Sequence, residues 1–148
     1  MLPHTIIGLA ADHAGFGCKE HIRDYLIQQG VEVKDFGTCS EESMDYPDVA
    51  HPLAEAVARK TVTAGVAFCG TGNGMVMTLN RHKGVRAGLS WTPAIAQLIR
   101  RHNDANICVV PARFVDAYTA QQIVTAFLSA TFEGGRHLRR IEKIEMYP

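Results

Sequence analysis

The sequence predicts one α/β domain, spanning residues 1–148, in which helices cover both faces of a five-stranded parallel sheet. Short apolar runs alternate with helical patterns five times along the chain, the order expected of parallel strands joined by right-handed crossovers. The central run has no polar alternation, which is typical of a strand buried on both faces. Nearly half of the residues are apolar and a fifth are charged, which suits a globular domain with a proper core.

In the first part of the chain, glycines and a proline separate the predicted elements. An apolar run at residues 5–10 predicts the first strand. Helical spacing of apolar positions begins at Gly17 and stops at Gly30. Residues 31–36 predict the second strand, and Pro47 suits the first turn of the helix that follows.

The remaining elements continue the alternation of strand and helix. They are a central strand at 66–68, a helix from 73 to about 80, a strand at 85–89, a helix opening at Thr92-Pro93, a strand at 107–110, a helix at 115–130 and a basic final helix after Gly135. Thr92 suits the N-cap position and Pro93 the first helical position.

The alternation predicts a three-layer, Rossmann-like architecture with the flavodoxin-like strand order 2-1-3-4-5 and an additional C-terminal helix. In that order the ligand crevice lies between the carboxyl ends of strands 1 and 3. Asp12 and His13 follow the first strand, whereas Cys69, Gly70 and Thr71 follow the third. The topology therefore predicts that an acid, an imidazole, a thiol and a hydroxyl meet at this edge.

Glycines at alternate positions follow the thiol of Cys69, at Gly70, Gly72 and Gly74. Without Cβ atoms they let the loop curl with several N–H groups facing one concavity, and a helix starting near Asn73 adds positive potential. Such a loop suits an anion, either a phosphate or a developing enolate oxygen. A tight turn beside a packed core thiol is the alternative interpretation.

The direction of its helix sets His102 apart from the crevice. That helix runs antiparallel to the sheet and ends near His102, so His102 is expected at the amino edge of the strands. If His102 is catalytic, it must serve a neighbouring subunit, which predicts a symmetric dimer with shared active sites. Arg113 follows a fifth strand expected at the sheet edge, and is also expected to lie far from its own crevice.

Structural roles are open alternatives for several of these residues. His13 could cap the following helix, and Asp12 could close an Asx turn. The helical spacing of His102 also fits a satisfied core histidine. Arg136 and Arg140 could belong to a solvated helix face.

Charge and composition narrow the classes of function. Fifteen acidic residues balance fifteen basic ones, which argues against nucleic acid or an anionic membrane as the principal partner. The four cysteines stand singly and the first residues show no leader pattern, so a cytoplasmic protein with reduced thiols is expected. Seven dispersed histidines without a His-x-x-x-His pair predict no metal site, and no cofactor is expected.

Six ordered motifs together extend over almost the whole chain. They are Asp12-His13-Ala14-Gly15, Asp45-Tyr46-Pro47, the loop from Cys69 to Gly74, Asn80 with Gly84 and Arg86, His102-Asn103-Asp104-Ala105-Asn106, and Glu133-Gly134-Gly135-Arg136-His137. In this order they resemble the B-type ribose-5-phosphate isomerases, which belong with the allose- and galactose-6-phosphate isomerases. The resemblance implies a metal-free isomerisation of a phosphorylated aldose and ketose through a cis-enediolate, in a homodimer with shared active sites or a tetramer.

The resemblance also implies a role for each site residue. Cys69 matches the base that moves a proton between C2 and C1, and Thr71 matches the hydroxyl that shuttles protons between O1 and O2. The enediolate would be bound by the main chain of Gly70, Gly72, Asn73 and Gly74. Asp12 and His102 match ring-opening residues, and Tyr46 and Asn103 match sugar contacts. The residues that match the phosphate-binding set are His13, Arg113, Arg136 and Arg140, with His102 and Arg113 supplied across the dimer interface.

The expected substrate pair is ribose 5-phosphate and ribulose 5-phosphate, and the alternative is a hexose 6-phosphate such as allose or galactose 6-phosphate. Pro111-Ala112 and Trp91 depart from the family pattern and bear on this choice. A low-molecular-weight tyrosine phosphatase also places a Cys-Gly loop after a parallel strand, but needs an arginine where this chain has Met75. A non-catalytic sugar-phosphate-binding module on the same fold is the alternative from another class.

Overall fold

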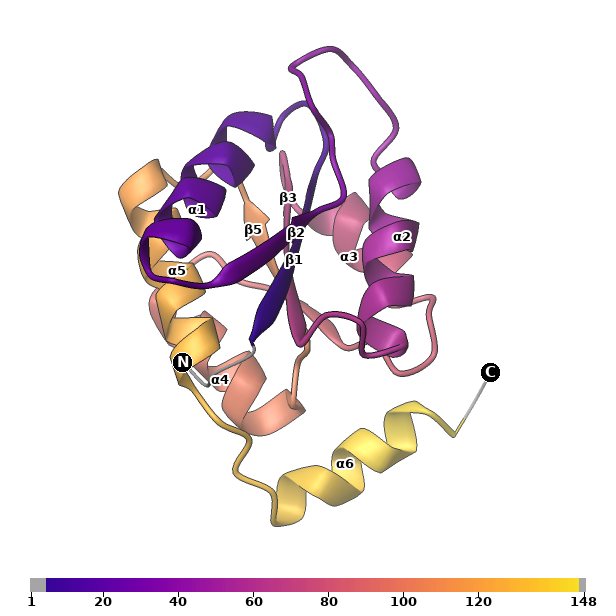
Figure 1. Cartoon of the computed structure of the whole chain (residues 1–148). Helices are drawn as coiled ribbons and strands as arrows, with labels where there is room; N and C mark the ends of the chain where they lie inside the picture. The colour runs from indigo at the N-terminus through magenta and orange to yellow at the C-terminus, as the bar shows by residue number, and fades with distance from the viewer. Residues whose placement is uncertain (1–4, 147–148) are drawn as a thin grey trace.

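Five parallel strands form the central sheet of the computed structural model, which describes residues 5–146 (Figure 1). The expectation about a leader pattern concerns residues outside that range. The strands are β1 (Ile6–Ala11), β2 (Glu32–Asp35), β3 (Ala64–Cys69), β4 (Ala87–Leu89) and β5 (Ile107–Pro111). The α/β class predicted from the sequence is confirmed.

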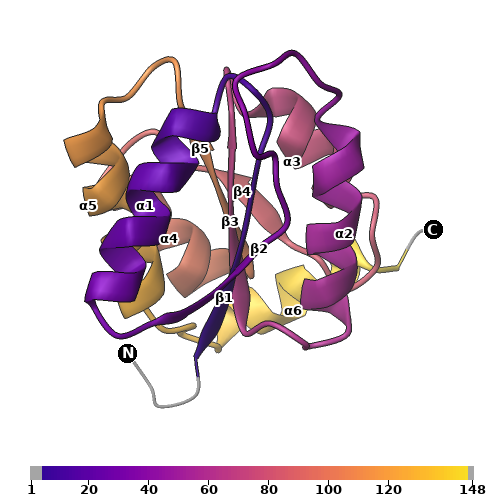
Figure 2. The same ribbon diagram turned by 45° about the horizontal axis from the view of Figure 1, so that its top comes forward.

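Helices cover both faces of the sheet, and one further helix lies beyond its amino edge (Figures 1 and 2). The helices are α1 (Phe16–Gln28), α2 (Pro47–Ala58), α3 (Asn73–Leu79), α4 (Pro93–Asn103), α5 (Ala117–Ser129) and α6 (Arg136–Ile144). Helices α1, α4 and α5 bury their apolar side chains in one core cluster, and α2 and α3 bury theirs in the other. In the part of the chain that the structure describes, none of these helices combines the length and apolar character needed to cross a membrane.

The strand order is β2-β1-β3-β5-β4, so the expected order of the last two strands is wrong. All five residues of β5 are buried, whereas all three residues of β4 are only half-buried. A strand inside the sheet must bury both faces, and an edge strand need not. The continuous apolar run of β5 therefore takes the inner position and β4 takes the edge.

The register places the carboxyl ends of β1, β3 and β5 side by side. Ala11 pairs with Phe68, and Cys69 pairs with Pro111. Beyond the paired residues, the Asp12 N–H donates to the Phe68 carbonyl at 3.2 Å. Residues that follow these three strands therefore meet at one edge, as the topology predicted.

Side chains close to the element ends determine where several helices and strands begin. Thr92 Oγ1 accepts the Ile95 N–H at 3.2 Å, and Pro93 is the first residue of α4, so this predicted cap is confirmed. Helix α5 begins two residues later than expected, because Asp116 caps it by accepting the Thr119 N–H. Strand β4 begins later than expected as well, because the Arg86 N–H donates to the Asn106 side chain.

Candidate active site

Cys69 and Asp12 form the centre of the site at the carboxyl edge. Cys69 is the last residue of β3 and Asp12 follows β1, and the two residues are 7 % and 6 % exposed. The Cys69 Sγ donates to Asp12 Oδ2 at 3.4 Å. Asp12 Oδ1 accepts the Gly15 N–H at 3.0 Å, so Asp12 closes a local turn and contacts the thiol at the same time.

Some neighbouring groups raise the pKa of Cys69 and others lower it. Burial raises the pKa of the thiol, and the charge and hydrogen bond of Asp12 raise it further. Hydrogen bonds from the N–H groups of Gly72 and Gly70 lower the pKa. The net effect is a raised pKa of the thiol, because burial and the Asp12 carboxylate outweigh the N–H groups of the loop.

The glycine loop turns directly into α3. Gly72 has a φ of +82° at the N-cap, a conformation that favours glycine. Thr71 is exposed, and its Oγ1 accepts the Asn73 N–H at 3.2 Å. A Cβ at Gly74 would lie 2.4 Å from Cζ of Tyr46, so the tyrosine ring lies directly over the loop. Tyr46 thus lies beside the loop that carries the thiol.

His13 is half-buried on the same edge. Its Nδ1 accepts the Met44 N–H at 3.2 Å, so the neutral ring carries its proton on Nε2, as an N–H donor. Helix α1 has no side-chain cap, so the alternative that His13 caps it is wrong. An N–H donor at this edge suits an anionic ligand.

Arg113 lies beside the glycine loop of its own subunit, which corrects the expectation that it is far from this crevice. Its N–H donates to the Gly70 carbonyl at 3.1 Å. A Cβ at Gly70 would lie 3.3 Å from Arg113 Cδ and from Nη1, so the exposed arginine side chain contacts the loop. The reason is the strand order, since β5 is the neighbour of β3 and not an edge strand.

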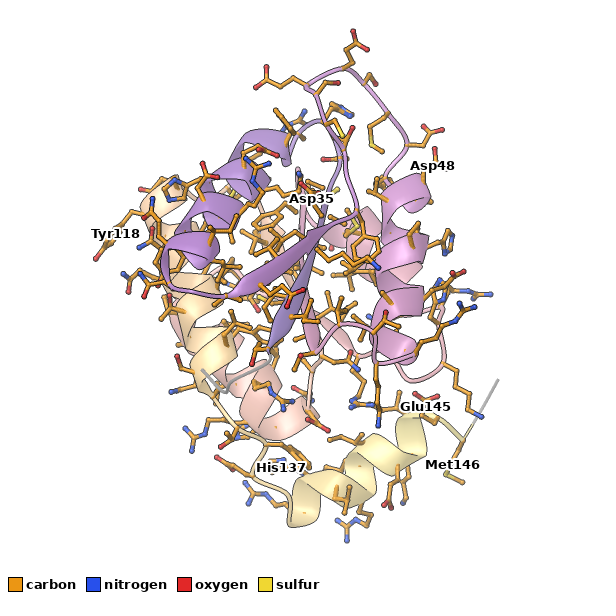
Figure 3. All side chains as sticks on the ribbon, in the orientation of Figure 1. Asp35, Asp48, Tyr118, His137, Glu145 and Met146 are labelled. Atoms are coloured by element: carbon orange, nitrogen blue, oxygen red, sulfur yellow. The ribbon has the colours of Figure 1, made fainter. Side chains whose placement is uncertain are left out.

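Four predicted site residues lie at the opposite edge of the sheet. His102 and Asn103 end α4, while Arg136 and Arg140 belong to α6. In Figure 3, His137 of α6 lies at the bottom of the molecule, below Asp35, the last residue of β2. The structure therefore separates the predicted site into a carboxyl-edge group and an amino-edge group within one subunit.

His102 belongs to a cluster that the sequence analysis did not identify. Its ring stacks on that of His137 with centroids 4.3 Å apart, and its side chain is 37 % exposed, so it is not a core histidine. Glu133 lies next to both rings and forms an ion pair with Arg101 at 2.5 Å. Glu133 and His137 are four residues apart, but Glu133 precedes α6, so helical spacing does not predict this cluster.

Neighbouring groups shift the pKa values of two residues in that cluster, Glu133 and His137. Desolvation opposes ionisation of Glu133, but Arg101, His102 and His137 together hold the pKa of its carboxyl below the ordinary value. Burial lowers the pKa of His137, and the nearby charges of Arg136 and Arg140 lower it further, against the opposite effect of Glu133. Glu133 is thus ionised and His137 neutral near pH 7.

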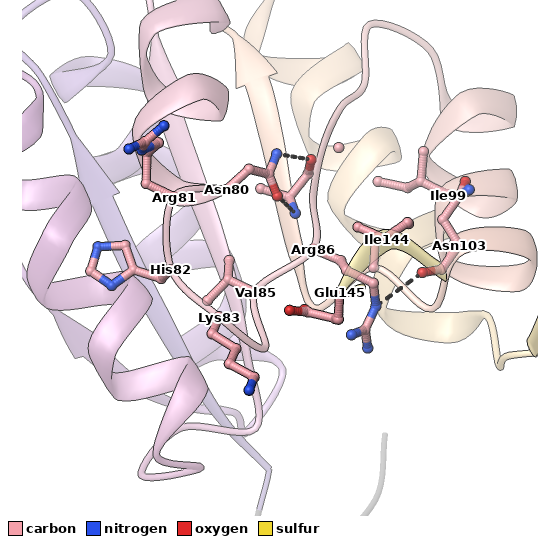
Figure 4. Close-up of a pocket in the computed structure, with 13 residues that line it drawn as sticks. Asn80, Arg81, His82, Lys83, Val85, Arg86, Ile99, Asn103, Ile144 and Glu145 are labelled. Carbon is pink, nitrogen blue, oxygen red and sulfur yellow. Dashed lines mark hydrogen bonds between the residues drawn. The ribbon is translucent and has the colours of Figure 1, made fainter. Parts of the chain in front are cut away.

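A cavity of about 720 Å³ also lies at the amino edge, away from Cys69 (Figure 4). Asn103 lines it, together with the segment that carries Asn80 and Arg86. The Asn80 side chain bonds both backbone groups of Ala87, and Arg86 Nε donates to the Asn103 carbonyl at 3.2 Å. Asn80 and Arg86 therefore hold the backbone around this cavity in place.

The chain is similar to known proteins over most of its length. A family model described as Ribose/Galactose Isomerase matches residues 7–144. The chain is 44 % identical over 138 residues to ribose-5-phosphate isomerase B of Escherichia coli, covering 93 % of each chain. A crystal structure of a ribose 5-phosphate isomerase from Thermotoga maritima superposes with a TM-score of 0.94 at 48 % identity, over 96 % of this chain and 98 % of that one.

A second solved structure carries a ligand. Ribose-5-phosphate isomerase B from Mycoplasma genitalium, with bound ribulose-5-phosphate, superposes with a TM-score of 0.93 at 39 % identity. The alignment covers 97 % of this chain and 96 % of that one.

Proposed function

The chain belongs to the ribose/galactose isomerase family as a B-type sugar-phosphate isomerase, and from this premise we propose that it interconverts ribose 5-phosphate and ribulose 5-phosphate. The observation that carries the proposal is the buried Cys69 thiol, in contact with Asp12 and beside the N–H groups of a glycine loop. A proton on carbon next to a carbonyl is removed by a base in reach, with donors for the oxyanion that forms. The Mycoplasma genitalium relative, whose structure holds ribulose-5-phosphate, supports this substrate class.

In the proposed reaction, the Cys69 sulfur takes the C2 proton of the open-chain aldose and the electron pair forms the enediolate. The N–H groups around Gly70 and Gly72 stabilise its oxygen. Return of the proton to C1, with Thr71 moving a proton between O1 and O2, gives the ketose. Asp12 Oδ2 already accepts the thiol hydrogen bond, so Asp12 is placed to take that proton and form the thiolate.

Asp12→Asn is expected to lower the pKa of Cys69, because it removes the charge that raises this pKa in addition to burial. Alkylation of Cys69 by iodoacetamide should then begin at a lower pH than in the parent, since the thiolate is the reacting form. Both proteins carry Cys39→Ser, because Cys39 is an exposed thiol. Identical pH profiles of alkylation in the two proteins would show that Asp12 does not affect the pKa of Cys69.

The two groups of site residues are proposed to meet across a symmetric dimer. His13 and Arg113 bind the phosphate from the carboxyl edge, and Arg136 and Arg140 approach from the amino edge of the neighbour. His102 and Asn103 approach in the same way, so that His102 opens the sugar ring in the partner's site. An isologous interface repeats this arrangement and gives two equal sites.

Subunit complementation tests the shared site. Cys69→Ala and His102→Ala are each expected to be inactive, but their mixed dimer contains one site with both native residues. Random exchange of subunits should therefore restore roughly a quarter of the parental activity. Each variant mixed with itself is the control. A mixture that stays inactive after exchange is confirmed by mass spectrometry would place both residues in the same subunit's site.

The proposed reaction is tested by turnover with a panel of phosphorylated pentoses and hexoses, followed by NMR in heavy water. Ribose 5-phosphate is expected to isomerise and to exchange its C2 proton with solvent. Turnover of allose or galactose 6-phosphate without turnover of ribose 5-phosphate would move the proposal to a hexose phosphate. Binding without proton exchange for every sugar would favour a non-catalytic sugar-phosphate-binding module.

A further inference from the structure

Two imidazoles and a carboxylate converge at the amino edge of the sheet. His102 comes from the end of α4, His137 from the first turn of α6 and Glu133 from the loop before it. The His102 Nε2 and His137 Nε2 atoms lie 3.8 Å and 3.6 Å from the same oxygen, Glu133 Oε2. One potential ligand atom from each of the three residues lies within 4.8 Å of the other two.

This spacing is close to that of a metal site. Zinc binds imidazole nitrogen at about 2.0–2.1 Å and carboxylate oxygen at about 2.0–2.2 Å, so tetrahedral ligand atoms stand about 3.3 Å apart. The two nitrogen–oxygen distances exceed this value by a few tenths of an ångström. The two imidazole rings stack nearly parallel, so a bound ion requires them to turn until both nitrogens point at it. Two histidines with one glutamate form an established ligand set for zinc.

The buried Nε2 atom of His137 is a second indication of a ligand at this place. His137 is 6 % exposed, and its Nε2 atom is buried without a hydrogen-bond partner. The distance of 3.6 Å to Glu133 Oε2 is too long for a hydrogen bond. A buried polar atom without a partner is destabilising, and coordination of a cation would satisfy it.

Glu133 is held in place while leaving one oxygen available. Its Oε1 pairs with Arg101, and its N–H donates to the Arg101 carbonyl at 3.0 Å, so the loop is fixed to α4. In the single subunit the side chains of His102 and Glu133 are 37 % and 34 % exposed, which gives an ion a path from solvent. Arg136 and Arg140 are exposed, so salt screens their repulsion of a cation.

We propose that His102, Glu133 and His137 form a binding site for a divalent transition-metal ion of the zinc class, with a fourth position open to water. The sequence expectation of no metal site depended on the absence of closely spaced histidines, and these ligands come from two elements far apart in the chain. A bound ion would occupy the nitrogen of His102 and inhibit ring opening. That consequence alone rests on the proposed function, whereas binding does not.

Isothermal titration calorimetry with Zn²⁺ on the metal-stripped full chain is the test, with Co²⁺ absorption to report the ligand type. We expect a single saturable ion per subunit and a cobalt spectrum without a thiolate charge-transfer band. His137→Asn should weaken the zinc affinity by at least about tenfold. Loss of a group that only supports a ligand already costs about 10–100-fold, and His137 is proposed as a ligand itself. Glu133→Gln provides a second variant, with folding of both checked by circular dichroism.

The matched control is His51→Asn, which disrupts the only other close imidazole pair among the described residues, His51 and His82 at 2.7 Å. Its zinc affinity should equal that of the parent. Absence of saturable binding, a thiolate band, or unchanged affinity in both His137→Asn and Glu133→Gln would overturn the site. Loss of affinity in His51→Asn alone would assign the ion to the other pair.

Discussion

Cys69→Ala is expected to reduce isomerase turnover by about 10²–10⁴-fold, the usual contribution of a positioned acid–base group. The alanine side chain has no group that can accept the C2 proton. Affinity for ribose 5-phosphate should change little, because the groups proposed to bind phosphate are other residues. Steady-state kinetics and calorimetric titration measure the two quantities separately.

Cys18→Ala is the matched control for the loss of a cysteine. Cys18 is a half-buried thiol of α1, outside the carboxyl-edge group, and its replacement should leave turnover close to that of the parent. Near-normal turnover in Cys69→Ala would remove Cys69 from the role of base. A parallel loss of affinity and turnover would instead indicate that the glycine loop had collapsed.

Gly15→Ala is expected to lower the free energy of unfolding by about 1–3 kcal/mol or more, as overpacking does. A Cβ at this position would lie 2.6 Å from Phe68 Cβ and 2.7 Å from the Phe68 carbonyl carbon and oxygen. These are atoms of the central strand that cannot rotate away. Since Gly15 also donates its N–H to Asp12, the variant should disturb the contact between Asp12 and Cys69.

Urea denaturation followed by circular dichroism measures this effect, and Gly17→Ala is the control. Gly17 lies in α1, two residues further along, and a Cβ there would meet nothing within 4 Å. Alanine is favoured over glycine in a helix by about 0.5–1 kcal/mol, so Gly17→Ala should be as stable as the parent or more stable. Equal stability of the two variants would contradict the packing argument.

Local sequence signals predicted most of the elements, but not the complete sheet order. Thr92 and Pro93 specify the start of α4 through their own chemistry, so that boundary could be read from the sequence. The order of β5 and β4 depends on which strand is buried on both faces. The polar Arg86 just before β4 and the unbroken apolar run at 107–110 contained that information.

The candidate site was predictable where topology alone brings residues together. The carboxyl ends of β1 and β3 placed Asp12 beside Cys69, as expected. The direction of the pKa shift of Cys69 was not predictable, because it depends on burial and on which Asp12 oxygen faces the sulfur. The cluster at Glu133 was missed because its histidines come from separate helices.

Because the two residue groups lie at opposite edges of one sheet, the specific activity is expected to depend on protein concentration. If a working site needs both edges, an isolated subunit carries two incomplete halves and turns over nothing. Specific activity should then fall on dilution, as dimers dissociate, and the initial rate should approach a second-order dependence on protein concentration. In a cell, the level of expression would set the working fraction of the protein as well as its amount.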